Sequence, residues 1–280
     1  MNVMSNSETA ELRRYGVLGT PLLATTYSQL AAFCERLVRV PGSHAVEFAN
    51  THIVVMRRCS PEFRRQTDNF DYFAPDGMPL IWCLNWQRAG LDDRVYGPAF
   101  FRRFFETAPV PFTHYLLGGS AECGARLRRV IQRWNPTQTV VGSFHGRCTM
   151  AGDLGDANQA VVDEINRLAP DFIWLGFGAP KQQNWICRHK HLIHRGIMLT
   201  VGFGFDVHAG TKKDAPLWMQ RRGLTWLFRL ASEPRRLVMR YLKYNSLFLF
   251  YLVWDGLRGR AFRPSSRTGR EGIATSAPSE

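Results

Sequence analysis

The stretch Asp171-Phe-Ile-Trp-Leu-Gly-Phe-Gly-Ala-Pro-Lys-Gln-Gln-Asn-Trp185 decides how this chain is organised. Its apolar run 172–175 predicts a buried strand, and Gly176 and Gly178 predict a sharp turn after it. Pro180 suits the first position of a following helix, whose start presents free N–H groups and partial positive charge. The first helical turn carries basic and amide side chains: Lys181, Gln182 and Gln183. These features favour a site for an anionic, hydroxyl-rich ligand, although an ordinary strand-to-helix turn has the same pattern.

Strand-like and helix-like segments alternate along the chain on both sides of this stretch. The pattern predicts an α/β fold with a doubly wound, mainly parallel, Rossmann-like sheet. Strands are expected at residues 44–48, 70–74, 113–117, 139–141, 172–175 and 196–201. Ligands of such sheets bind beyond the carboxyl ends of the strands. Five corners are expected to meet there: Asp76, 118–120, 142–146, 176–183 and 202–206.

The composition changes along the chain and suggests four segments. Residues 1–20 are expected to be a flexible lead-in, 21–214 the Rossmann-like catalytic domain, and 264–280 a disordered, Ser- and Arg-rich tail. Residues 215–263 are predicted to form a helical, basic and aromatic appendage. From Arg221 to Arg263 ten Lys and Arg residues face two acidic residues, which suits association with an anionic membrane surface.

The overall composition bounds the classes of partner and the compartment. The net charge of +13 on 280 residues points to an anionic partner: nucleic acid, lipid or a phosphorylated substrate. The six cysteines are scattered without a C-x-x-C pair, as expected for reduced thiols in the cytosol. The polar N-terminus predicts no signal peptide, and no run of about 18 apolar residues is present to span a bilayer.

Asp76 is the best single candidate for a catalytic group. It follows a predicted strand and precedes Gly77, where partial desolvation would raise its pKa toward the range useful for a general base. The alternative role is an N-cap for the helix that begins near Met78. Asp206 has the same ambiguity. Gly118, Gly119 and Ser120 could bind phosphate through backbone amides, or could form a plain tight turn.

The sequence gives no sign of a metal or a dinucleotide cofactor. No D-x-D triplet is present, and no His/Cys/Glu cluster has metal-ligand spacing. A diphosphate would therefore have to be balanced by Arg, Lys and helix N-termini. Only two glycines of a dinucleotide fingerprint follow the strand at 172–175, and Met198 stands where an acid is expected. We expect no cofactor and no metal.

Several stretches, in order, resemble the WecG/TagA/CpsF family of bacterial glycosyltransferases (glycosyltransferase family 26). The resemblance extends over about residues 44–245. The matching stretches are Asp76-Gly-Met-Pro-Leu-Ile-Trp82, Arg94-Val-Tyr-Gly97, Leu117-Gly-Gly-Ser120, 142–146, Gly176-Phe-Gly-Ala-Pro-Lys-Gln-Gln183, Gly202-Phe-Gly-Phe-Asp206, 210–216, Leu224-Thr-Trp-Leu-Phe-Arg229 and Glu233-Pro-Arg-Arg236.

The resemblance implies transfer of a sugar from a UDP-sugar to a polyprenyl-diphosphate-linked saccharide in cell-surface polysaccharide biosynthesis. It further implies an inverting, metal-independent reaction by a peripheral protein on the cytoplasmic face of the plasma membrane. Asp76 is the implied catalytic base, and Asn50, Arg94 and Gln182 are implied near the substrates. The implied C-terminal arginines that complete the site are Arg229, Arg236 and Arg240.

The chain departs from the family pattern at five positions. Phe48 stands in place of the usual Thr, Ala99 of Asp, Gln183 of Glu, Asp214 of Arg and Thr225 of Glu. These departures leave the donor and acceptor sugars open. A basic membrane- or nucleic-acid-binding protein without transferase activity is the alternative reading, and a dehydrogenase or methyltransferase is a third class. The charge is concentrated beside aromatic segments, which favours a membrane over nucleic acid. A homo-oligomer is possible.

Overall fold

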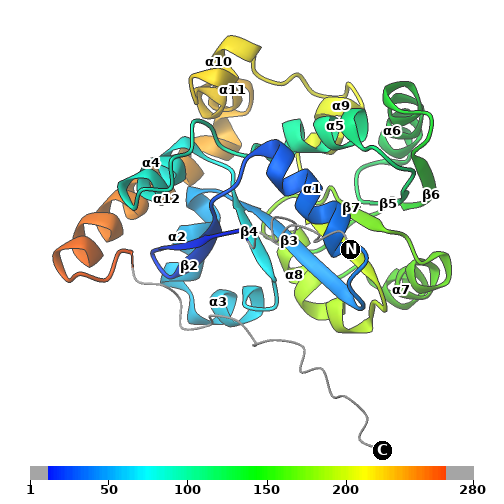
Figure 1. Ribbon diagram of the computed structural model, residues 1–280, viewed down its shortest axis with the longest axis horizontal. Helices are drawn as coiled ribbons and strands as arrows, with labels where there is room; N and C mark the ends of the chain where they lie inside the picture. Colours follow the sequence, from blue (N-terminus) through cyan, green and yellow to red (C-terminus); the bar gives the residue numbers. More distant parts are fainter. Residues whose placement is uncertain (1–11, 263–280) are drawn as a thin grey trace, which may run out of the picture.

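The computed structural model describes residues 12–262 and has three layers, with a central sheet between two sets of helices (Figure 1). The strand order is β1-β2-β4-β3-β8-β7-β5-β6, and only β1 runs antiparallel to its neighbour. The predicted doubly wound, mainly parallel α/β sheet is confirmed. The strands are Arg14–Val17 (β1), Thr20–Leu23 (β2), Ser43–Ala49 (β3), Tyr72–Pro75 (β4), Thr113–Leu117 (β5), Thr139–Phe144 (β6), Phe172–Leu175 (β7) and Gly196–Thr200 (β8).

Two apolar layers hold the helices on the sheet. One layer, rich in Phe from α5, packs against Trp174 and Phe172 of β7. Its helices are Tyr27–Leu37 (α1), Gly97–Thr107 (α5), Ala121–Trp134 (α6) and Gly204–His208 (α9). The opposite layer holds Thr51–Cys59 (α2), Pro61–Thr67 (α3), Met78–Trp86 (α4), Ala157–Leu168 (α7) and Lys181–His189 (α8). Because both faces are covered, the central strands are apolar runs rather than alternating ones.

Three further helices follow the sheet: Leu217–Arg221 (α10), Thr225–Ser232 (α11) and Pro234–Leu257 (α12). α12 runs along α2 at one edge of the molecule (Figure 1). Its Asp255 forms a bidentate ion pair with Arg58, at 2.7 and 3.0 Å, and Phe248 is buried in the apolar layer. The segment predicted as a helical appendage is therefore docked on the α/β domain through α12.

Two local expectations are wrong. Residues 14–20 are not an irregular lead-in, because β1 and β2 form a hairpin that extends the sheet. The corner expected at residues 142–146 begins late, since β6 continues to Phe144. A Cβ at Gly142 would lie 2.5 Å from the Tyr115 ring, so this glycine allows strand packing rather than a ligand turn. Residues 1–11 and 263–280, which include the predicted tail, lie outside the described part of the chain.

Candidate functional site

The site is built where β3 and β4 end side by side in parallel. Ala49 pairs with Pro75 in register, and the Asp76 N–H donates to the Ala49 carbonyl at 2.7 Å. The two next residues, Asn50 and Asp76, therefore emerge at the same edge of the sheet. The Asn50 side chain accepts from the Ile53 N–H at 3.2 Å and caps α2. Asn50 thus has a structural role at the site edge, in addition to the substrate role that the resemblance implies.

Asp76 does not cap the helix that follows it. Gly77 holds the N-cap position of α4, with no side-chain capping bond. Instead, Asp76 Oδ2 accepts from the Gly97 N–H at the start of α5, at 3.4 Å. Burial raises the pKa of Asp76 to about 7, against the opposing effects of Arg94, the Gly97 N–H and Arg229. A carboxylate with that pKa, still partly exposed, suits a general base near neutral pH.

Arg94 joins the sheet to the C-terminal helices. Its Nη2 donates to Thr225 Oγ1 of α11 at 2.6 Å, and its guanidinium lies over the Tyr96 ring at 4.7 Å. The Tyr96 hydroxyl in turn donates to Asp214 Oδ1 at 3.1 Å. Charges from three separate segments therefore act on Asp76. Tyr96 stands in a matching stretch and Asp214 was noted as a departure, but neither was predicted to act at Asp76, because only the fold brings them together.

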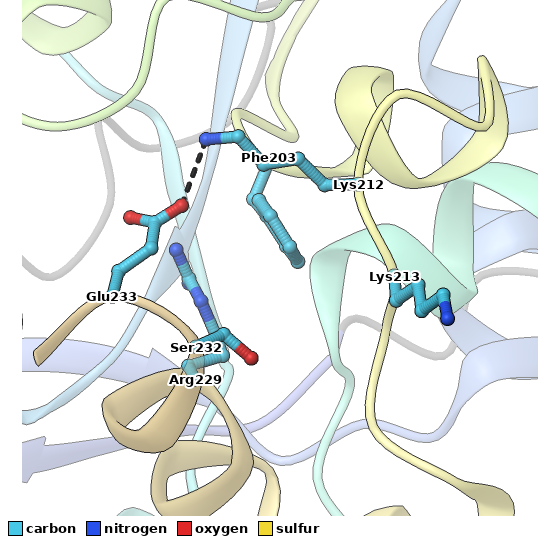
Figure 2. Close-up of a pocket in the computed structure, with 6 residues that line it drawn as sticks. All are labelled: Phe203, Lys212, Lys213, Arg229, Ser232 and Glu233. Atoms are coloured by element: carbon cyan, nitrogen blue, oxygen red, sulfur yellow. Dashed lines mark hydrogen bonds and ion pairs between the residues drawn. The ribbon is translucent and has the colours of Figure 1, made fainter.

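Arg229 of α11 lines a cavity of about 310 Å³ next to this cluster (Figure 2). Its guanidinium lies 4.1 Å from the centre of the Phe203 ring. Lys212 bridges two acids here, Glu233 at 2.8 Å and Asp206 at 3.5 Å. The cavity is lined by Phe203, Lys212, Lys213, Arg229, Ser232 and Glu233. Its basic groups suit an anionic ligand, and the predicted residue Asp206 contributes through its ion pair with Lys212.

The turn after β7 is held by its own side chains. Gly178 has a left-handed φ of 78°, and its N–H donates to Gln182 Oε1 at 3.0 Å. Pro180 precedes the helix rather than starting it, because α8 begins at Lys181. Gln182 and Gln183 are both buried. Of the four residues predicted to bind substrate here, Gln182 and Gln183 brace the protein, and Lys181 is partly exposed.

Gly118, Gly119 and Ser120 form the turn between β5 and α6. Gly118 and Gly119 have φ values of 117° and 75°, which glycine tolerates and other residues rarely adopt. The Ser120 hydroxyl accepts from the Cys123 N–H at 3.1 Å and caps α6. A Cβ on Gly118 would lie 3.0 Å from the Gly176 carbonyl carbon. The close approach of the turn after β7 therefore explains why position 118 is glycine. Phosphate binding by the turn at 118–120 stays a prediction.

The other two predicted arginines lie on α12. Arg240 faces α2, where its charge adds to burial in lowering the pKa of His52 to about 3. Its charge therefore acts at the contact between α2 and α12. Arg236 belongs to α12, but its side chain lies outside the described part of the structure. The structure places the Arg229 charge close enough to Asp76 to lower the pKa of that carboxyl.

Glu47 is the largest omission of the sequence analysis. It lies inside β3, 1 % exposed, and accepts from Gln183 Nε2 and Thr200 Oγ1, both at 2.8 Å. Sequence reasoning placed it inside the strand expected at residues 44–48 and gave it no role. One signal was present, since Gln183 stands where the resembling family usually has Glu, and a displaced carboxyl could have been sought nearby.

Within residues 12–262 no three His, Cys, Asp or Glu side chains are grouped so as to hold a metal ion. Metal independence remains a prediction. In the same part of the chain no helix has both the length and the apolar character to cross a membrane.

Comparison with known proteins agrees with this architecture. The sequence profile of the glycosyl transferase WecG/TagA/CpsF family matches residues 15–262, and the chain belongs to that family of glycosyltransferases. Similar proteins include the N-acetylglucosaminyldiphosphoundecaprenol N-acetyl-beta-D-mannosaminyltransferases of Staphylococcus aureus strains MRSA252 and MW2. Each is 25% identical over 240 residues, which cover 85% of this chain and 91% of the relative.

Proposed function

We propose that this member of the WecG/TagA/CpsF family transfers a sugar from a UDP-sugar to a polyprenyl-diphosphate-linked saccharide in cell-surface polysaccharide synthesis. The observation that carries the proposal is Asp76, a partly exposed strand-end carboxylate whose pKa is raised to about 7 beside Arg94 and Arg229. The names of the relatives describe transfer of a sugar to a diphosphoundecaprenol-linked acceptor, which supports this substrate class.

The proposed step moves one sugar with inversion. Asp76 takes the proton from the acceptor hydroxyl, whose oxygen forms a bond to the anomeric carbon of the donor sugar. The bond from that carbon to the diphosphate breaks on the opposite side, and UDP leaves with the electron pair. Arg229 and the basic groups of its cavity balance the charge that develops on the leaving diphosphate. No metal is required in this scheme.

Membrane contact is proposed for the outer side of α12. Its exposed apolar residues, here called the α12 stripe, are Leu249, Phe250, Val253, Trp254 and Leu257. Trp86 of α4, 82 % exposed, stacks on Phe262 just beyond α12 and extends the apolar surface. The Arg258 guanidinium lies over Trp254 at 4.0 Å. Aromatic and basic groups together suit an anionic bilayer interface, so we place the protein peripherally on the cytoplasmic face.

The same stripe argues against nucleic acid as the partner, because backbone phosphates bind basic grooves rather than exposed Phe, Leu and Trp. We therefore propose lipid as the anionic surface that the net charge predicts.

The proposal is tested by incubating the full chain with UDP-sugars and a polyprenyl-diphosphate-linked amino sugar in excess chelator. We expect UDP release in step with product, and an inverted anomeric configuration by NMR. Lack of UDP release from any UDP-sugar would overturn the proposal. Strict dependence on added magnesium or manganese would overturn its metal-free part.

A further inference from the structure

Glu47 is an acid buried in β3, a central strand of the sheet, at 1 % exposed. Its Oε1 accepts from Gln183 Nε2 and its Oε2 from Thr200 Oγ1. Within residues 12–262 no Lys, Arg or His forms an ion pair with it. A buried carboxyl held by neutral donors alone is costly, and the general apolar packing of the fold does not require it.

The contacts of Glu47 connect β3, which ends just before Asn50, to β8 and to α8, which carries the predicted residues Lys181, Gln182 and Gln183. Gln183 lies in the first turn of α8, directly after Gln182, which holds the Gly178 turn. Thr200 ends β8, and its hydroxyl oxygen also accepts from the Phe48 N–H at 3.3 Å. The Glu47 carboxyl thus joins the start of α8 to the carboxyl-terminal ends of β3 and β8.

We propose that Glu47 is a positioning residue of the transfer site, fixing α8 against β3 and β8 and acting by its charge on the nearby Asp76. This inference rests on the proposed transferase function. Glu47 lies two residues before Ala49, to whose carbonyl Asp76 is hydrogen-bonded. Glu47 is therefore a neighbour of the proposed base rather than a group that contacts substrate.

The charges around the pair support coupling. Burial raises the pKa of Glu47 to about 7, against the hydrogen bonds from Thr200 and Gln183; Asp76 raises it further and Arg57 lowers it. Two neighbouring carboxyls that titrate in one range do not ionise independently.

The groups that face Asp76 are the guanidinium groups of Arg94 and Arg229, the Gly97 N–H and the carboxylate of Asp214. Asp76 also raises the pKa of Glu47, because the two carboxylates repel each other when both are ionised. Removing the Glu47 charge should therefore ease ionisation of Asp76 without touching these contacts.

Gln183 is suited to hold Glu47 in both charge states. Its Oε1 is buried without a hydrogen-bond partner. Turning the amide over presents this oxygen to Glu47, which can donate to it when protonated. The carboxyl and the amide could therefore exchange places, with Gln at position 47 and Glu at position 183. This exchanged pair is the control for the test.

The test compares Glu47→Gln, Glu47→Leu and the exchanged pair Glu47→Gln with Gln183→Glu, all in the full chain. The pH dependence of kcat/KM for sugar transfer is measured for each. Glu164→Gln is the matched control, because Glu164 accepts from the Tyr115 hydroxyl at 2.6 Å elsewhere on the sheet.

We expect Glu47→Gln to keep kcat/KM at its plateau within roughly threefold, since the amide can retain both hydrogen bonds. The acid limb of its kcat/KM–pH profile, where the rate rises as Asp76 loses its proton, should move to lower pH by on the order of half a unit. The shift is expected because the loss of a neighbouring negative charge lowers the pKa of Asp76. The exchanged pair should return the limb toward the wild-type position. Glu47→Leu should raise KM for the donor about tenfold, since Gln183 and Thr200 are left unpaired.

An unshifted acid limb in Glu47→Gln, or an exchanged pair that behaves like Glu47→Gln alone, would overturn this inference. These readings hold even where Glu47→Leu does not fold. Absence of transfer by the wild-type chain would overturn the proposed function, and this inference with it. Transfer by the wild type with no shift in Glu47→Gln overturns this inference alone.

Discussion

The strand-end region and the C-terminal helices differ in which side chains they bury: the first buries acidic groups, and the second exposes apolar ones. At the strand ends, Glu47 is buried and Asp76 is only partly exposed, and burial raises the pKa values of both carboxyls to about 7. On α12, Phe250, Trp254 and Leu257 are exposed to solvent. The first region is suited to chemistry at one hydroxyl, and the second to a surface. Arg94, which donates to Thr225 of α11, connects them.

The largest effect is expected from Asp76→Asn. Loss of a general base should lower transfer by roughly 100-fold or more while UDP binding stays near wild type. Steady-state kinetics and calorimetric titration with UDP on one preparation provide the measurement. Full turnover by the variant would show that Asp76 is not the general base.

The surface role is tested by replacing Phe250 and Trp254 with Glu. Both side chains are more than 40 % exposed, at 54 % and 42 %, so the fold should persist. Loss of apolar contact and added negative charge should weaken binding to anionic vesicles at least tenfold. Met150→Glu, at an exposed apolar site on a distant loop, should bind as the wild type does.

Unchanged vesicle binding of the double variant would remove the membrane role of the α12 stripe. A change in sedimentation in place of a change in vesicle binding would instead assign the stripe to contact between two copies of the chain.

The link between the two regions is tested by Arg229→Gln. Removing the guanidinium should lower kcat/KM about tenfold, the value of one charge-assisted contact. Because Arg229 lowers the pKa of Asp76, the acid limb should also move to higher pH, opposite in sign to Glu47→Gln. Arg222→Gln, an exposed neighbour, should alter neither quantity. If the acid limb of the kcat/KM–pH profile of Arg229→Gln lay at the wild-type pH, Arg229 of α11 would not act on Asp76.

The smallest effect concerns stability. Since the folded pKa of Asp76 is raised, its contribution to stability is full below the unfolded value of 3.8 and is lost as pH rises through about 7. The melting temperature of Asp76→Asn, relative to wild type, should therefore rise by a few degrees between about pH 5 and 8. Scanning calorimetry across that range measures the difference, and a constant difference would argue against a raised pKa.

Much of the fold could be predicted because its signals are local. The strands at 113–117 and 172–175 were expected with the bounds that the structure has. The hairpin of β1 and β2 was missed because its strands are only four residues long, and β2 joins the sheet by pairing with β4, some fifty residues later in the chain. Pairing between distant segments leaves no mark in a short window of sequence.

In the candidate site, the residue at a strand end could be predicted from the sequence, and the residue buried inside a strand could not. Asp76 could be identified from a strand end followed by glycine. Glu47 could not, because only the approach of α8 and β8 supplies the donors Gln183 and Thr200 that let an acid remain in a central strand. Asp214 likewise depends on a loop returning to Tyr96.

The pH dependence of transfer by the wild-type chain tests the central claim most directly. If Asp76 is the base, it must lose its proton before it can act. Log kcat/KM should then rise with a slope of one and level off above about pH 7, the range set by the burial of Asp76. The residual activity of Asp76→Asn should lack that limb. A wild-type rate that stays constant from about pH 5 to 8, or an Asp76→Asn profile with the same limb, would contradict the account.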